Sequence, residues 1–152
     1  HYACDGSWWE CEEPGYGQHC LREFAGLKLA GRSIDGTMKV GIDVVNAMLW
    51  TGVEIGGGGN SASQGLNLAV LFGARRVILT GVDCQGPGQH WHGQHPAALA
   101  QHKPHTFAIW IEAFGKLAPN LAERGVEVVN ASRDTALRCF PRMPLADALS
   151  AP

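Results

Sequence analysis

The sequence predicts an α/β fold, a Rossmann-like, mostly parallel sheet with helices on both faces, in a single domain over residues 1–152. A helix pattern at residues 61–72 is followed, after a tight Gly-Ala-Arg connection, by a short β-branched run at residues 76–83. A second helix pattern at residues 107–121 is followed by a second such run at residues 126–130. Because βαβ crossovers are right-handed, this alternation predicts parallel strands covered by helices on both sides.

The amino-terminal part predicts shorter elements. Residues 2–4 end a strand that turns at an Asp-Gly pair, and Trp8 and Trp9 then open a short helix or a loop. A buried strand normally follows other structure, so we expect the first strand and helix of the fold to precede His1. The other elements expected before the central helix are a loop at residues 10–18 and strands at residues 26–31 and 38–45.

Capping residues and prolines predict where the later helices begin and end. Ser61 or Ser63 is expected to be the N-cap of the central helix. Pro119 lies inside the second helix pattern, which we expect it to kink or divide. Two short helical turns are expected after the last strand, one capped by Ser132 and one at residues 144–149.

The composition is that of a globular protein without an overall basic footprint. The chain has 45% hydrophobic and 17% charged residues and a formal net charge of −2, so we expect no nucleic-acid partner. No apolar run approaches the roughly 20 residues that span a bilayer, so we expect no membrane partner. Five cysteines without a Cys-x-x-Cys pair favour reduced thiols in a cytoplasm.

The most informative motif is the glycine-rich turn at residues 56–61, GGGGNS, which opens the central helix. Gly58 and Gly59 let the backbone approach a ligand, and the helix that follows offers unpaired N–H groups to an anion. Asn60, Ser61 and Ser63 add side-chain hydrogen-bonding groups. The motif is neither a dinucleotide-binding fingerprint nor a Walker loop. The alternative is a turn that needs glycines only for its geometry.

Two carboxylates follow predicted strands. Asp83 ends the run at residues 76–83, and Asp5 follows the strand at residues 2–4. In open α/β sheets, ligands bind outside the carboxyl ends of strands, so the two could hold a ribose hydroxyl, a metal or an amine. The alternative is that each caps a loop. Cys84 comes next and is expected to be a small buried residue, because no partner for a nucleophile is evident.

The long segment at residues 84–105 contains the run HWHGQH. His90, His92 and His95 could bind zinc, since the first two lie on one side of an extended segment. His92 is alternatively a general base that meets a substrate. The third possibility is a polar loop that is merely rich in histidine.

Taken together, these motifs resemble a family common in phages and prophages. The resemblance rests on YACDGSWW, GGNSASQGLNLA, GVD and HWHG and on a closing stretch at residues 125–141. It covers nearly the whole chain and implies a phage-encoded protein in the host cytoplasm. Members of that family usually carry a further strand and helix before the YACD stretch.

More remotely, the glycine-rich turn and the strand-end aspartate are similar to two groups of enzymes. One is the bacterial sialyltransferases that use a CMP-sugar, and the other is the archaeal 6-hydroxymethylpterin diphosphokinase-like domain, which implies ATP and a divalent metal. Both resemblances imply a nucleotide over Gly59, Asn60 and Ser61. They also imply that Asp83 lies beside the ribose or reacting centre, and that His92 is the base of a sugar transfer.

The chain departs from these groups at two places. Ala62 stands where the remote relatives tend to have Gly, and, against the sialyltransferases alone, CQG at residues 84–86 replaces the tyrosines that follow their strand-end aspartate. The expected function is a transferase of glycosyltransferase type, with a CMP-type nucleotide-sugar at the glycine-rich turn. One alternative is an ATP-dependent diphosphokinase whose Asp83 and Asp5 hold magnesium. The other is a phage accessory protein that binds a nucleotide or zinc without catalysis. An exposed sheet edge would favour a homo-oligomer.

Overall fold

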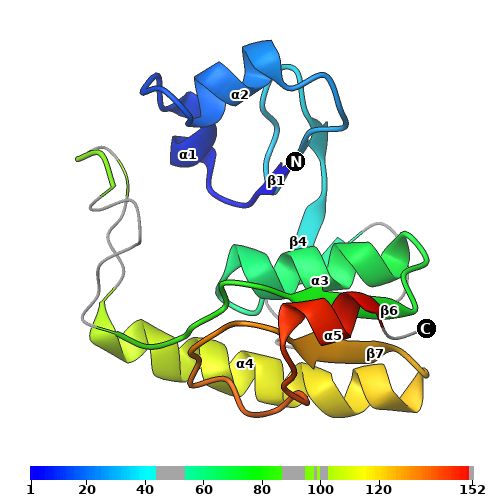
Figure 1. The fold of residues 1–152 in the computed structure, drawn as a ribbon. Coiled ribbons are helices and arrows are strands. Elements are labelled where there is room, and N and C mark those ends of the chain that lie inside the picture. The colour runs from blue at the N-terminus through cyan, green and yellow to red at the C-terminus, as the bar shows by residue number, and fades with distance from the viewer. Residues whose placement is uncertain (44–53, 87–94, 98, 100–102, 151–152) are drawn as a thin grey trace.

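The computed structural model describes residues 1–43, 54–86, 95–97, 99 and 103–150 (Figure 1). In these ranges the fold is mixed α/β, and every pairing between strands is parallel. The strands are β1 (Tyr2–Ala3), β2 (Leu29–Ala30), β3 (Met38–Lys39), β4 (Gly41–Asp43), β5 (Glu54–Gly56), β6 (Arg76–Leu79) and β7 (Glu127–Asn130). The helices are α1 (Gly6–Glu10), α2 (Gly17–Glu23), α3 (Ser61–Leu71), α4 (Pro104–Glu123) and α5 (Leu145–Ser150).

The described strands form three small sheets. Their orders are β1-β2-β3, β4-β5 and β6-β7. The predicted α/β class with parallel strands is therefore confirmed. A single continuous Rossmann-like sheet is not visible in the described ranges, where the strands are only two to four residues long. None of the helices in these ranges has the length and apolarity that a membrane crossing needs.

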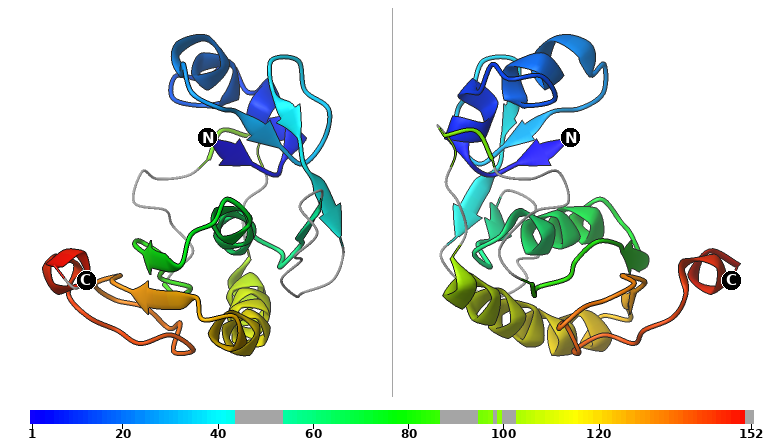
Figure 2. Two further views of the ribbon diagram at one scale, coloured as in Figure 1. Left: turned by 90° about the vertical axis from the view of Figure 1, so that its right-hand side faces the viewer. Right: turned by 60° about the vertical axis from the view of Figure 1, so that its left-hand side comes forward.

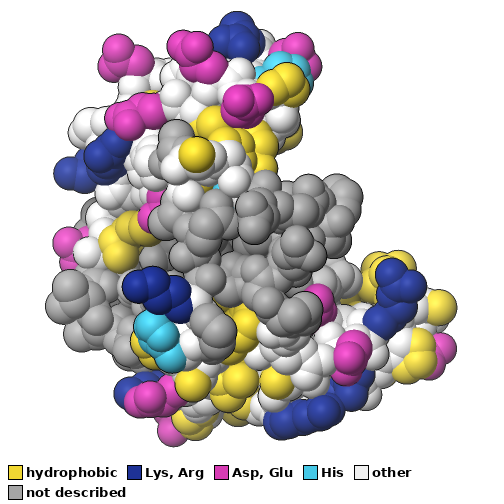
Figure 3. All heavy atoms as spheres, turned by 90° about the vertical axis from the view of Figure 1, so that its left-hand side faces the viewer, with side chains coloured by type: hydrophobic (Ala, Val, Ile, Leu, Met, Phe, Trp, Pro, Cys, Tyr) yellow, Lys and Arg dark blue, Asp and Glu magenta, His cyan; other side chains and the backbone are white. Residues whose placement is uncertain are grey.

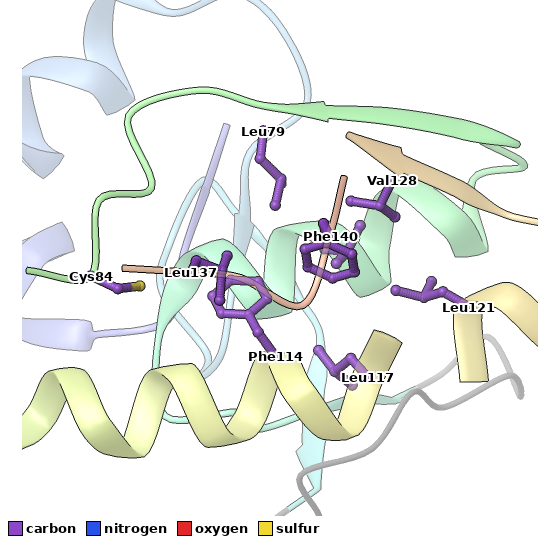
Figure 4. Close-up of a cluster of buried hydrophobic side chains, with 9 residues drawn as sticks. Leu79, Cys84, Phe114, Leu117, Leu121, Val128, Leu137 and Phe140 are labelled. Carbon is purple, nitrogen blue, oxygen red and sulfur yellow. The ribbon is translucent and has the colours of Figure 1, made fainter. Parts of the chain in front are cut away.

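The carboxyl-terminal half has three layers around β6 and β7. Leu79 and Val128 face α3 and α4 and pack in a core with Leu66 and Phe114 (Figure 4). Val129, one residue on from Val128, packs instead with Ala148 of α5 and belongs to a second cluster. The left view of Figure 2 shows the same division, with α3 and α4 on one side of the two strands and α5 on the other. Alternation of apolar residues thus buries both faces of this pair.

Chain direction sets which ends lie together. In Figure 1, α3 and α4 both begin on the left, and β6 and β7 run back toward that side. The amino ends of two helices and the carboxyl ends of two parallel strands therefore share one edge, which we call the carboxyl edge. This is the edge at which α/β proteins bind ligands.

The amino-terminal half is built around a buried tryptophan. Trp9 is fully buried in α1 and donates from Nε1 to the carbonyl of Ala3 at 3.0 Å. Of the two alternatives expected at the tryptophan pair, a short helix or a loop, the structure has the helix. Helix α2 is not predicted, because its first residues were assigned to a loop. Gly17 begins α2 against the backbone of Trp8 and Trp9, where a Cβ would collide. That glycine serves the close approach of two helices rather than a loop.

Three predicted boundaries are wrong, because contacts from distant residues set them. The N-cap of α3 is Asn60, whose side chain accepts from the Ser63 N–H, and not Ser61 or Ser63. The strand at residues 76–83 ends at Leu79. Ser132 caps no helix; its hydroxyl accepts the Val82 N–H at 2.9 Å and so turns the chain after β6 toward the chain after β7.

Most of the remaining predicted elements are present in the structure. Pro119 does not divide α4, which continues to Glu123. The strands predicted at residues 26–31, 38–45 and 126–130 contain β2, β3 with β4, and β7, although Val40 interrupts the second of them. The last helix is confirmed as α5. Strand β5, which leads into the glycine-rich turn, is not predicted, because its neighbours are glycines.

Candidate functional site

The glycine-rich turn joins β5 to α3 with a left-handed backbone. Gly58 and Gly59 have φ angles of 57° and 70°, a region that side chains other than glycine rarely adopt. A Cβ on Gly58 would also collide with the hydroxyl of Ser63. Glycine is thus needed here both for the backbone conformation and for the close approach of α3.

The side chains of Asn60 and Ser63 form hydrogen bonds within the turn itself. The Oδ1 of Asn60 accepts the Ser63 N–H at 2.8 Å, and its Nδ2 donates to the carbonyl of Gly58 at 3.1 Å. The buried Ser63 hydroxyl donates to the carbonyl of Asn60 at 3.0 Å. Two predicted ligand contacts, Asn60 and Ser63, therefore position the turn. Ser61 is exposed, so contact with a ligand would fall to its hydroxyl and to the first backbone amides of α3.

Three further side chains that the sequence did not single out fix the turn from behind. Gln64 donates from Nε2 to the carbonyl of Gly57 at 2.7 Å, and Trp110 of α4 donates from Nε1 to the carbonyl of Gly59 at 2.7 Å. Asn67 accepts the N–H of Gly56 at 2.9 Å. Gln64 and Asn67 are almost fully buried on α3. The sequence held one signal for this supporting role: Gln64 and Asn67 are amide side chains three residues apart on the apolar face of a helix.

Gln64 also ties the amino-terminal strand to the turn. The Tyr2 hydroxyl donates to its Oε1 at 3.0 Å, and its Nε2 lies 3.6 Å from the Cys4 sulfur. Burial raises the pKa of the Tyr2 phenol, which therefore stays a donor. Through one side chain, β1 and the glycine-rich turn are held together. Asp5 follows β1 as the exposed N-cap residue of α1, and its side chain makes no capping bond.

Asp83 lies in a different part of the carboxyl edge. It lines a cavity of about 1060 Å³, which we call the strand-end cavity, between the segments that follow β6 and β7. The lining residues are Thr80, Gly81, Asp83, Ala131, Ser132, Arg133, Asp134, Arg142, Met143, Pro144 and Leu145. No residue of the glycine-rich turn is among them. The glycine-rich turn and Asp83 therefore lie at the same edge but apart: the turn adjoins α3, whereas the cavity lined by Asp83 includes Leu145 of α5. Figures 1 and 2 show α3 and α5 on opposite sides of β6 and β7.

Hydrogen bonds to backbone carbonyls hold the walls of the strand-end cavity together. The Thr135 hydroxyl, fully buried, donates to the carbonyl of Val82 at 2.7 Å, and the Ala136 N–H donates to the carbonyl of Asp83 at 2.8 Å. Arg142 donates from one Nη to the carbonyls of Ser132 and Arg133, at 3.3 and 3.1 Å. Figure 3 looks onto this edge and shows acidic, basic and apolar side chains interspersed on its lower part.

The histidine prediction lies largely outside the described residues, since these include neither His90 nor His92. His95 is described: its ring meets that of Tyr16 edge-on at a centroid distance of 6.4 Å. Within the ranges that the structure describes, no three His, Cys, Asp or Glu side chains gather as a metal site. The zinc site and the general base His92 stay predictions.

Cys84 is confirmed as a buried residue. It is 8% exposed, and burial, with the neighbouring Asp83 carboxylate, raises the pKa of its thiol to about 11. A thiol that is protonated at neutral pH is a poor nucleophile. Its backbone has φ of 49°, so the chain is strained directly after Asp83.

Comparisons of the chain with models of known protein families, with curated proteins and with solved structures found no match. The resemblances stated from the motifs therefore stay predictions. Function has to be inferred from the geometry of the carboxyl edge.

Proposed function

We propose that this chain binds a nucleotide-type small molecule at its glycine-rich turn, and that it is a nucleotide-sugar-dependent transferase of glycosyltransferase type on a Rossmann-like fold. One observation carries the proposal. A turn of left-handed glycines is held rigidly at the amino end of the 11-residue helix α3, on the edge where β6 and β7 end. Backbone amides and the positive end of the helix dipole favour a phosphate there.

The surrounding hydrogen bonds support this proposal by limiting reorganisation. Gln64, Asn67 and Trp110 come from two helices and bind the backbone of three of the four glycines of the turn. Donors that are already fixed need not reorganise when charge develops on a leaving phosphate, and such preorganisation is a large part of catalysis by electrostatic stabilisation. A turn needed only to reverse the chain would not require supports from both α3 and α4.

Each predicted residue then has a distinct role. Gly58 and Gly59 bring the backbone close to the nucleotide, and Ser61 offers its hydroxyl and amide to the phosphate. Asp83, exposed in the segment that follows β6, orients a hydroxyl of the ribose or of the acceptor. His92 deprotonates the acceptor.

Isothermal titration calorimetry with CMP, a CMP-sugar, ATP and GTP tests the proposal. We expect CMP or the CMP-sugar to bind, and the CMP-sugar to be consumed when an acceptor is present. Binding of CMP without turnover of any CMP-sugar would mean that the protein binds a nucleotide but is not a transferase. Binding of none of the four nucleotides would overturn the proposal.

A second candidate function is favoured by two carboxylates that share the strand-end cavity, Asp83 and Asp134. Such a pair can hold magnesium for diphosphoryl transfer from ATP. Asp5, the partner predicted for Asp83, does not line this cavity. If ATP binds only with Mg²⁺, and Asp134→Asn abolishes this Mg²⁺-dependent binding, the diphosphokinase function replaces the first proposal.

A further inference from the structure

We propose that the strand-end cavity is a second ligand site and that it takes a small zwitterion, a molecule with a carboxylate at one end and an ammonium group at the other. This inference goes beyond the proposed function: the cavity shares Asp83 with the site proposed there, but none of its lining residues belongs to the glycine-rich turn, and the proposed function assigns it no zwitterion. It rests on two observations: charged side chains of both signs line the cavity, and none of them forms an ion pair with a residue that the structure describes.

Two guanidinium groups and two carboxylates line the cavity. Arg133 and Arg142 supply the positive charges, and Asp83 and Asp134 supply the negative ones. Among the residues that the structure describes, no ion pair within 4.0 Å joins any of these four side chains to another charged group. Opposite charges therefore share one cavity without neutralising each other. A ligand with both charges can bridge them.

Arg142 is positioned to receive the anionic end. Its Nη2 group is directed at two backbone carbonyls of the cavity wall, those of Ser132 and Arg133. Arginine has five N–H donors, so the Nε and the second Nη remain for a ligand. Guanidinium groups bind carboxylates through two parallel hydrogen bonds, and a group already oriented by its neighbours loses little freedom when it does so.

Charge balance favours a zwitterion over a ligand with a single charge. The net charge of two arginines and two aspartates is zero. The aspartates therefore repel a lone anion, and the arginines repel a lone cation such as Mg²⁺. A zwitterion satisfies both signs and adds no net charge. Ala131, Met143, Pro144 and Leu145 add apolar surface to the wall, which suits an aliphatic spacer between the two charged ends. A volume of about 1060 Å³ leaves room for a side chain as well.

The experiment is a titration of the full chain, followed by two-dimensional amide NMR, with a series of ω-amino acids as probes: glycine, β-alanine, γ-aminobutyrate and ε-aminohexanoate. Butyrate, butylammonium and MgCl₂ serve as single-charge controls. We expect at least one amino acid to shift amide signals of Asp83 and Arg133 and to bind at least about tenfold more tightly than butyrate or butylammonium. The length that binds best reports the separation of the two charge pairs.

Variants assign the two ends of the ligand. Asp134→Asn is expected to weaken binding of the zwitterion about tenfold but not that of butyrate, which loses a repelling carboxylate, whereas Arg142→Gln is expected to weaken both. The matched controls, Arg138→Gln and Asp147→Asn, lie outside the cavity lining and should change neither. Since Arg142 also supports the cavity wall, Asp134→Asn decides the result if Arg142→Gln unfolds.

Three outcomes overturn the inference: no amino acid binds, the single-charge probes bind equally well, or Mg²⁺ alone produces the same shifts. Nucleotide binding is measured separately on Asp134→Asn, with and without Mg²⁺. If the amino acids fail while CMP still binds, only the second site is wrong. If CMP fails while an amino acid binds, only the nucleotide proposal is wrong.

Discussion

Removal of the Gln64 side chain should destabilise the protein more than removal of any other side chain that hydrogen-bonds to the glycine-rich turn. Gln64 is 3% exposed, donates to the carbonyl of Gly57 at 2.7 Å and accepts from the Tyr2 hydroxyl at 3.0 Å. Gln64→Ala deletes these two hydrogen bonds of about 1 kcal/mol each and a weaker one to the Cys4 sulfur, and leaves a desolvated carbonyl and a small void. The free energy of unfolding should fall by about 2–4 kcal/mol, which lowers Tm by roughly 5–15 °C in a domain of this size.

Urea denaturation, followed by tryptophan fluorescence, measures this loss. Gln85→Ala is the matched control, because the Gln85 side chain forms no hydrogen bond or ion pair with any residue that the structure describes. This change should alter stability by less than about 0.5 kcal/mol. A double-mutant cycle with Tyr2→Phe isolates the bond between the amino-terminal strand and α3. The coupling energy should reach at least about 0.5 kcal/mol. Additive effects of the two mutations would refute the account of how β1 is attached to the turn.

Three further predictions concern single positions. Asn60→Ala should cost about 1 kcal/mol of unfolding free energy and Asn60→Ser much less, because only the serine can cap the Ser63 N–H; equal chemical denaturation midpoints would contradict this. Gly65→Ala should raise stability by about 0.5–1 kcal/mol in thermal melts, since Gly65 lies inside α3 and a Cβ there would meet nothing within 4 Å; a lower Tm would show hidden crowding. The pKa of Cys84 is raised to about 11, so the folded state keeps this proton between pH 9 and pH 11 while the unfolded state loses it, and stability falls as pH rises through that window. Cys84→Ala should remove about 2–3 kcal/mol of that fall, and an unchanged pH profile would contradict the burial of the thiol.

Local patterns predicted the elements whose residues bury one another within the carboxyl-terminal half. The apolar run of β6 and the stripe of α4 are visible in the sequence because Leu79, Phe114 and Leu117 recur at strand and helix spacing. The strand end was misplaced at Asp83 because Ser132 and Thr135, some 50 residues away, bind the backbone of Val82 and turn the chain. Such a contact leaves no trace in the local pattern.

The site was predictable to the same extent. Glycines at a helix start identified the turn, because Gly58 and Gly59 must adopt a left-handed backbone. The roles of Asn60 and Ser63 as supports depend on which way each side chain points, which residue type does not reveal. The strand-end cavity could not be found from the sequence, because Arg133, Asp134 and Arg142 meet Asp83 only when the segments after two parallel strands fold onto each other.

The glycine-rich turn as a phosphate site is the central claim, and Asn60→Asp tests it most directly. An aspartate keeps an oxygen to cap the Ser63 N–H, and its negative charge suits the helix amino end. The same charge repels a bound phosphate a few ångströms away. Calorimetric titration of CMP into the wild type, Asn60→Asp and the neutral control Asn60→Ser should show Kd raised at least about tenfold only in the aspartate variant, with all three proteins folded. Equal affinity in the three proteins, or no binding to the wild type, would contradict the claim.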